Sequence, residues 1–236
     1  MKALGTGLLS LVLIAGLSFP VDAQVAGTKG FGIHAAYNIP TFTLRKHYSS
    51  GGIKGGALFA YVVNETWTAE VEGNFSQYSG GNVEDASFTW NVDGNAYKSP
   101  GASSEMKWIT GSLAFLYHFN QGGSKLGVGG GAPYVSFGTG FYRYKNEVGG
   151  LIWPGQKSEP LNKSLKLQTI EDRRVALTVN VGLGVEYFAS ESFAFDIRGQ
   201  YNVSLGNLRP REAWDIAEAW PLQNLDIGVR LKFYQN

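Results

Sequence analysis

Apolar and polar residues alternate one by one along several stretches of the chain, so that each stretch has one apolar and one polar face. The stretch Trp67–Tyr78 is the clearest case, because Val71 and Phe75 alternate there with Glu70 and Glu72. A period of two residues is typical of β-strands whose two faces meet different surroundings. The pattern predicts eight strands, which are Phe31–Asn38, Ile53–Val63, Trp67–Tyr78, Lys107–Phe119, Leu126–Tyr144, Arg174–Phe188, Phe193–Ser204 and Asn224–Phe233.

One of these strands, Leu126–Tyr144, is expected to be irregular. Its apolar positions change parity around Pro133, because Tyr134 is even-numbered whereas Val135 and Phe137 are odd-numbered. An extra residue in one strand shifts the parity in this way, and proline inside a sheet is found mainly at edges or bulges. We therefore predict a β-bulge near Pro133.

Alternation alone does not distinguish a soluble barrel from a membrane barrel, but the composition of the two faces does. In a soluble barrel the apolar side chains fill the interior. Here one face is almost wholly apolar and aromatic, and the other carries glycine, alanine, serine, threonine and several charges, which is typical of a transmembrane barrel with a polar interior. Two interfacial aromatic belts are also expected, one from Tyr61, Trp67, Tyr117, Phe119, Tyr187, Phe193 and Phe233 and the other from Tyr37, Phe75, Tyr78, Tyr142 and Tyr201.

The predicted connections alternate between short and long. Those at Asn64–Thr66, Asn120–Lys125 and Ala189–Ser192 are short, whereas those near 39–52, 79–106, 145–172 and 205–222 are long. Short periplasmic turns and long extracellular loops are the usual asymmetry of outer-membrane barrels. We therefore predict an all-β fold, an eight-stranded antiparallel transmembrane β-barrel with short periplasmic turns and long extracellular loops.

Two of the long loops contain signs of local structure. Residues Phe88–Tyr97 alternate around Asp93-Gly94, which predicts a β-hairpin that projects from the second loop. Residues Pro210–Trp220 begin with one proline and are followed by another, Pro221, which predicts a short helix in the fourth loop.

The first residues of the chain are typical of a secretory signal. Lys2 precedes the apolar stretch Leu8–Leu17, and Val21-Asp22-Ala23 places small residues before Gln24. The apolar stretch is too short to span a bilayer, which takes about 20 residues. We expect residues 1–23 to be a cleaved signal peptide and residues 24–236 to form the barrel domain.

Composition narrows the possible chemistry. The chain has no cysteine, which excludes disulfides and thiolate metal sites, and its 20 Lys and Arg nearly balance its 19 Asp and Glu, which gives no reason to expect nucleic acid as a partner. We expect no metal and no cofactor. The charges on the polar face are expected to form an ion network inside the barrel, because an isolated charge in so narrow a lumen is very costly; they are Glu70, Glu72, Glu186, Asp196, Arg198, Asp226, Arg230 and Lys232.

The long loops hold the candidates for interaction and for catalysis. Arg45 and Lys46 are suited to the phosphates of lipopolysaccharide. The adjacent His47 and Ser49 have the base and the hydroxyl of a nucleophilic site, but no Asp or Glu between Gln24 and Asn64 could orient the histidine, so a polar loop histidine is the simpler interpretation. Loop tryptophans either bind a partner or pack the loops onto the barrel; they are Trp90, Trp153, Trp214 and Trp220.

Taken together, residues 27–236 resemble the small outer-membrane barrels of the OmpA/OmpX type, within the outer membrane protein β-barrel domain group. The final strand, Asn224–Phe233, is similar to the family's closing strand, although Tyr234-Gln235-Asn236 follow the phenylalanine on which the family commonly ends. The resemblance implies a bacterial outer-membrane location and a non-enzymatic role in envelope integrity or in surface and partner interactions through the loops, with outer-membrane lipids, lipopolysaccharide and possible envelope proteins as partners. The alternatives are a subunit of a larger outer-membrane complex, a lipid A-modifying enzyme and a narrow ion channel.

Overall fold

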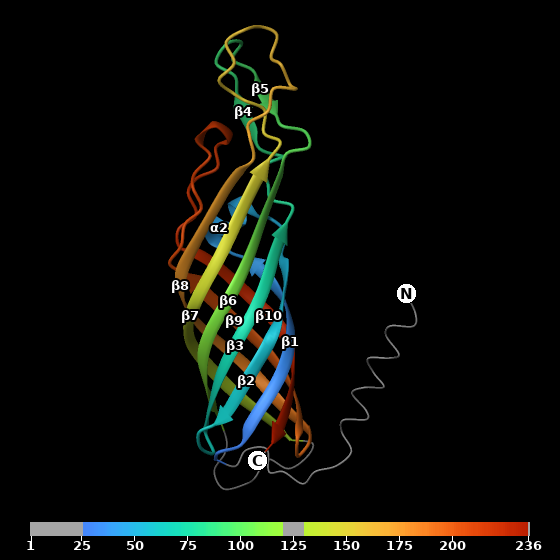
Figure 1. Ribbon diagram of the computed structural model, residues 1–236, viewed down its shortest axis with the longest axis vertical. Coiled ribbons are helices and arrows are strands. Elements are labelled where there is room, and N and C mark those ends of the chain that lie inside the picture. Colours follow the sequence, from blue (N-terminus) through green and yellow to red (C-terminus); the bar gives the residue numbers. More distant parts are fainter. Residues whose placement is uncertain (1–25, 120–129, 236) are drawn as a thin grey trace, which may run out of the picture.

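The structure is a computed structural model that describes residues 26–119 and 130–235. The expected signal peptide, residues 1–23, and the expected turn Asn120–Lys125 lie outside the described residues. The described chain forms a closed barrel of eight antiparallel strands in the order β1-β10-β9-β8-β7-β6-β3-β2 (Figure 1). The predicted fold class is therefore confirmed. The barrel strands are β1 (Lys29–Pro40), β2 (Gly52–Val62), β3 (Trp67–Ser79), β6 (Ser103–His118), β7 (Gly131–Gly149), β8 (Ile170–Ser190), β9 (Phe193–Ser204) and β10 (Leu222–Gln235).

Strand β3 illustrates how the alternation in the sequence becomes an inside and an outside. Val71 is 55% exposed on the outer wall, whereas its neighbours Glu70 and Glu72 are buried in the interior. Successive side chains of a strand point to opposite faces, and closing the sheet turns these faces into a lipid-facing wall and a lumen. The apolar outer wall is thus the surface that the hydrocarbon of the membrane covers.

The predicted bulge at Pro133 is wrong. Strand β7 keeps an unbroken register with β6 and β8, and the register shift lies instead on β8, between Phe188 and Ser190. The parity argument failed because Tyr134 belongs to the inward face, where its hydroxyl donates a hydrogen bond to Asp196. A tyrosine counted as apolar was in fact one of the polar residues of the lumen.

The expected aromatic belts also need a correction. Tyr37 and Phe75 lie on the outer wall, as expected for an interfacial belt, but Tyr78 and Tyr142 are buried inside the barrel. Both are even-numbered residues on strands whose even positions face the lumen. Their nearness to a strand end suggested the belt, but strand parity determines the side on which they lie.

Strands β6, β7 and β8 continue well beyond the other strands and rise above the rest of the barrel (Figure 1). With 16, 19 and 21 residues, they exceed the 9–11 residues that a tilted strand needs to cross a bilayer. Parts of the expected loops 79–106 and 145–172 are therefore strand. This extension was not predicted, because its outward residues are charged and so lack the apolar alternation of the membrane-spanning part.

A compact group of loop segments, here called the head, sits on this extension. It contains the predicted hairpin, formed by β4 (Ser87–Thr89) and β5 (Ala96–Lys98), with Gly94 at a φ of +72° in the turn. The head is held together by a cluster of buried apolar residues from three loops and from the upper end of β7, which are Val83, Phe88, Trp90, Ala102, Val148, Leu151, Ile152, Trp214 and Ile216.

The fourth loop does not form the predicted helix. Only the single 3-10 turn η1 (Glu212–Trp214) is present, and the flanking residues pair across the loop as Arg211 with Ile216 and Leu208 with Ala219. The turn ends at Asp215, whose φ of +54° is left-handed. The first loop contains a short helix that was not predicted, α2 (Phe42–His47). Neither helical segment of the described chain is long and apolar enough to cross a membrane.

The assignment of inside and outside is testable at the middle of β8. Val179 is 51% exposed on the lipid-facing wall, and the adjacent Thr178 is fully buried and faces inward. Val179→Arg should lower the free energy of unfolding in lipid vesicles by about 2–4 kcal/mol, because it places a cation in hydrocarbon. Thr178→Val should cost about 1 kcal/mol, the value of the hydrogen bond that Thr178 donates to the Val203 carbonyl. Equal urea midpoints for Val179→Arg and the wild type would show that the assigned parity is wrong.

Candidate functional site

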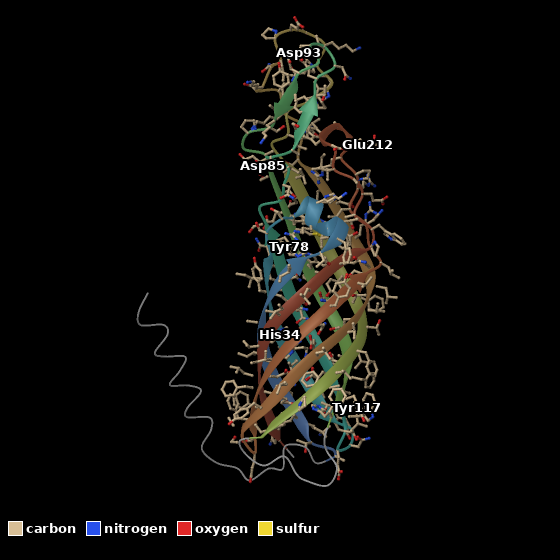
Figure 2. The ribbon with its side chains drawn as sticks, turned by 180° about the vertical axis from the view of Figure 1, so that it is seen from behind. His34, Tyr78, Asp85, Asp93, Tyr117 and Glu212 are labelled. Carbon is tan, nitrogen blue, oxygen red and sulfur yellow. The ribbon has the colours of Figure 1, made fainter. Side chains whose placement is uncertain are left out.

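The interior of the barrel is divided into a charged middle and two apolar ends. The extracellular end is filled by a cluster of Leu44, Tyr48, Tyr78, Met106, Trp108, Tyr142, Tyr144, Ala176, Leu208, Ala219 and Leu222. The periplasmic end is filled by Leu58, Ala60, Val62, Ala132, Phe188, Ala194 and Tyr234. Figure 2 shows Tyr78 near the mouth, above His34 in the middle of the barrel. The charged groups lie between the two clusters.

Arg198 is surrounded by three carboxylates and is fully buried. Its guanidinium donates to Glu70 at 2.6 Å and to Glu72 at 3.0 Å, both across the lumen on β3, and to Asp196 on its own strand at 3.1 Å. The planar guanidinium has five N–H donors, so it can serve several acceptors at once. One arginine thus ties two sides of the barrel together.

Lys232 also contacts three carboxylates, two of which it shares with Arg198. Its ammonium lies 2.6 Å from Glu70, 2.9 Å from Asp196 and 3.2 Å from Glu186. Arg198 pairs with Asp196, whereas among the described residues it forms no ion pair with Glu186. Glu186 instead contacts Lys232 and accepts a hydrogen bond from the Tyr234 hydroxyl at 2.5 Å.

Arg230 and Asp226 are the last two residues of the predicted network. Arg230 belongs to the ion pairs around Arg198, whereas Asp226 belongs to a different pair. Arg230 contacts Glu72 at 3.0 Å and so extends the network around Arg198. Asp226 forms a separate pair with Lys54 at 2.7 Å and accepts hydrogen bonds from the Asn202 and Asn224 side chains. Lys54 was missing from the expected network, although its polar side chain among apolar residues was the available signal.

Tyr134 is a second lumen residue that was missed. Its hydroxyl donates to Asp196 at 2.5 Å and accepts from Arg198 Nε at 2.6 Å, and the Arg198 guanidinium lies 5.1 Å from the centre of its ring. The misplaced bulge at Pro133 hid its inward orientation. What the assembled groups can do is bind one another, since each charge of the network has an opposite charge within ion-pairing distance.

His47 lies in the first loop, as its position in the sequence implies, but its side chain does not point into solvent. It is buried at the end of α2, and its Nε2 lies 2.9 Å from the Ala217 carbonyl. Burial lowers the pKa of His47 below its ordinary value, which favours the neutral ring at pH 7. The side chain therefore connects the first loop to the fourth. Ser49, its possible catalytic partner, is exposed.

The other loop candidates divide into a buried and an exposed group. Trp90 and Trp214 are buried in the head, where Trp90 Nε1 donates to the Gln156 carbonyl at 2.8 Å. Trp153 and Trp220 are 43% and 61% exposed. Arg45 and Lys46 are also exposed, on α2 and outside the head. Among residues 26–119 and 130–235, no group of three or more His, Asp or Glu is placed to hold a metal ion.

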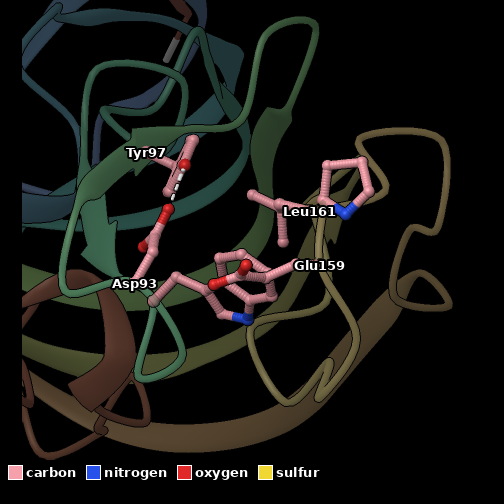
Figure 3. A pocket seen from close by; sticks show the side chains of 6 residues that line it. Asp93, Tyr97, Glu159 and Leu161 are labelled. Atoms are coloured by element: carbon pink, nitrogen blue, oxygen red, sulfur yellow. Dashed lines mark hydrogen bonds between the residues drawn. The ribbon is translucent and has the colours of Figure 1, made fainter.

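The head contains an open pocket of about 440 Å³ between the hairpin and the third loop (Figure 3). The Tyr97 hydroxyl donates a hydrogen bond to Asp93 at 2.5 Å, and this bond lowers the pKa of the Asp93 carboxyl. The Lys163 ammonium lies 6.0 Å from the centre of the Tyr97 ring. The pocket is lined by Trp90, Asp93, Tyr97, Glu159, Pro160 and Leu161.

A closed barrel with an apolar outer wall and a polar lumen is typical of outer-membrane proteins. Residues 9–233 match the family described as outer membrane protein beta-barrel domain. The chain belongs to this family. It is therefore a protein of the bacterial outer membrane, and the apolar outer wall is its lipid-facing surface.

Several solved structures of outer-membrane proteins are similar to this chain at low sequence identity. A major outer membrane protein from Thermus thermophilus is 12% identical, with a TM-score of 0.52 over 88% of this chain and 99% of the other. Neisserial surface protein A is 11% identical, with a TM-score of 0.46 over 88% and 98% of the two chains. The N-terminal barrel domain of Pseudomonas aeruginosa OprF is 16% identical, with a TM-score of 0.42 over 87% and 97%. No curated protein matches the sequence.

Removing the central cation of the lumen should destabilise the barrel. Arg198→Ala leaves the buried carboxylates Glu70, Glu72 and Asp196 with one cation fewer, so the free energy of unfolding should fall by about 3–5 kcal/mol. The control Arg209→Ala removes an exposed arginine of the fourth loop and should leave the urea midpoint unchanged. Wild-type stability in Arg198→Ala would mean that the network does not hold the strands together.

Trp90, one of the two buried tryptophans of the head, should determine the rigidity of the loops. Trp90→Ala removes a side chain that is 1% exposed, a change that usually costs about 3–5 kcal/mol in a core. Trypsin should then cleave the folded protein faster at Lys98, Lys157 or Lys163. Trp220→Ala, at an exposed position, should leave cleavage as in the wild type. Equal cleavage rates for the two variants would show that Trp90 does not hold the head together.

Proposed function

We propose that this outer-membrane barrel is non-enzymatic and serves envelope integrity or surface and partner interactions through its extracellular loops. The ordered structure of the head is the main support for this proposal. Its loops are fastened to one another by a buried apolar cluster, and they stand on strands that continue out of the membrane. Ordered loops lose little conformational entropy on binding, which favours recognition.

The residues that the loops leave exposed support an interaction surface. Trp153 and Trp220 expose large aromatic rings, whereas the loop tryptophans Trp90 and Trp214 are buried. Tryptophan and arginine are enriched at the centres of protein interfaces. In the proposal these two tryptophans contact an envelope protein, while Arg45 and Lys46 bind phosphates of lipopolysaccharide as charge-assisted donors. A subunit of a larger outer-membrane complex would use the same surface.

The contacts inside the lumen favour a closed, non-conducting barrel and not an ion channel. Arg198, Lys232 and Arg230 are engaged with carboxylates from neighbouring and opposite strands, and an apolar cluster fills each end of the described interior. A hydrated path would require both clusters to open and the pairs to separate. The proposed barrel therefore carries a side-chain-filled lumen that gives no steady conductance.

The enzyme alternative rests on His47 and Ser49, and the contacts of His47 favour a structural role. Its Nε2 faces the Ala217 carbonyl. The charged group that acts on its pKa is the cation Arg211, which lowers it. A catalytic base needs an orienting partner such as a carboxylate on the other ring nitrogen. His47 supports the proposal as a link between two loops.

The proposal can be tested with photo-crosslinking amino acids placed at single positions in living cells. Crosslinks to lipopolysaccharide or to an envelope protein are expected from positions 153 and 220, where the side chains are exposed. Position 214 is the matched control, because Trp214 is buried in the head and should give only crosslinks within the chain. Absence of any intermolecular product from both exposed positions would contradict an interaction through these loops.

Lipid A from the same cells separates the enzyme alternative. Mass spectra of lipid A should be identical with and without the protein. An acyl chain that is gained or lost only in the presence of His47, and not in His47→Ala, would overturn the non-enzymatic assignment.

A further inference from the structure

The outer wall of the extension carries its charges in two rows of like sign. Lys107, Lys145 and Arg173 are partners in the register of β6, β7 and β8, so three cations stand side by side. One step further from the membrane, Glu105, Glu147 and Glu171 are partners in the same way. Like charges directly opposite each other on a sheet are destabilising, so an arrangement into rows needs a compensating interaction.

Part of the compensation comes from pairing between the rows. Lys107 lies 3.1 Å from Glu105, and Lys145 lies 2.6 Å from Glu147 and 3.1 Å from Glu171. Arg173 is paired with Glu171. All these carboxylates lie on the side away from the membrane. The membrane side of the cation row is left open to another anion.

Arg143 lies on this membrane side and strengthens the positive charge there. It is exposed on β7, opposite Ile109 of β6 and Val175 of β8, which are among the most exposed apolar residues of the outer wall. Arg143 forms no ion pair with any residue in 26–119 or 130–235. An unpaired guanidinium therefore stands at the upper edge of the lipid-facing surface.

From this geometry we infer that Arg143, Lys107 and Lys145 bind the phosphate of a phosphorylated glycolipid of the lipid A class in the outer leaflet. Phosphates of such a lipid lie directly above its acyl chains, at the level where these cations follow the apolar wall. The fork of a guanidinium fits phosphate oxygens in a bidentate manner. The acyl chains of the same lipid would lie on Ile109, Phe141 and Val175.

The row of glutamates limits where the phosphate can bind. Glu105, Glu147 and Glu171 repel an anion that approaches from the extracellular side, so a phosphate is favoured only between the cation row and the hydrocarbon. This is the position of a lipid phosphate, not of a soluble anion. The cation row and Arg143 together carry four positive charges against three negative ones, which leaves one charge uncompensated.

The opposite wall of the barrel offers no similar surface. The outward residues at the upper ends of the described parts of β1, β2, β9 and β10 include no lysine or arginine; they are Tyr37, Ile39, Ile53, Tyr201, Val203, Gln223 and Leu225. The cations of the proposed lipid site are therefore confined to the wall formed by β6, β7 and β8. It deepens the lipopolysaccharide contact of the proposed function, on which it rests, but it uses different residues from Arg45 and Lys46.

The inference can be tested by native mass spectrometry of the folded protein in detergent. The probes are bisphosphorylated lipid A, the same lipid without phosphates, and phosphatidylglycerol. Arg143→Gln combined with Lys107→Gln should weaken the binding of bisphosphorylated lipid A by about 25-fold, since each cation near an anionic lipid contributes about fivefold. The matched control is Lys98→Gln with Lys163→Gln, which removes two cations from the head and should leave binding unchanged.

Two further measurements distinguish lipid binding at the outer wall from binding at the first loop and from misfolding of the variants. Arg45→Gln with Lys46→Gln tests the loop contact, and the effect of about 25-fold should persist in that background. Wild-type protein should retain bisphosphorylated lipid A more strongly than the dephosphorylated lipid, a result that needs no variant to fold. Equal binding of the two lipids, equal binding of phosphatidylglycerol, or unchanged binding by the folded Arg143→Gln/Lys107→Gln variant would each overturn the inference.

Discussion

Every main-chain N–H and C=O group within the membrane must find its hydrogen-bond partner inside the protein, because hydrocarbon provides none. The chain meets this constraint by pairing β1 with β10, so that the sheet has no open edge in the membrane. Closure fixes which side of each strand faces lipid and which faces the lumen. The alternating sequence, the apolar outer wall and the narrow polar interior all follow from this requirement.

A narrow interior, in turn, determines how charges can be accommodated. An eight-stranded barrel is just wide enough for its own side chains, so each charged group must find its counter-ion among them. Arg198 reaches Glu70 and Glu72 on the far wall, and Lys232 reaches Glu186 and Asp196 nearby. The contacts of Arg198 with β3 and of Lys232 with Glu186 on β8 join strands that do not share main-chain hydrogen bonds, so the lumen adds cross-links that closure alone does not supply.

Alternation in the sequence was sufficient to place the charged residues inside the barrel, but it misplaced several tyrosines and did not predict which residues of distant strands pair. The inward position of Glu70 and Arg198 follows from their place in an alternating strand. The pairing of Lys54 with Asp226 does not, because β2 and β10 are separated by β1 and meet only across the lumen. Tyr134 was misplaced because tyrosine suits both an apolar wall and a polar interior. The upper parts of β6–β8 were missed because charged outward residues carry no hydrophobic period, although their main chain continues the sheet.

This extension gives the barrel two unequal sides. Strands β6, β7 and β8 carry the head and a charged outer wall, whereas on the opposite side α2 and the fourth loop fold over the mouth and fill it with Leu44, Leu208 and Ala219. Because β7 runs without a register break from Tyr134 in the lumen to Val148 in the head, the head is held by the same strand that lines the ion network. A rigid connection of this kind keeps the exposed loops at a fixed height above the membrane. Lipid headgroups beside the wall and a partner above the head can therefore be bound by separate surfaces of one fold.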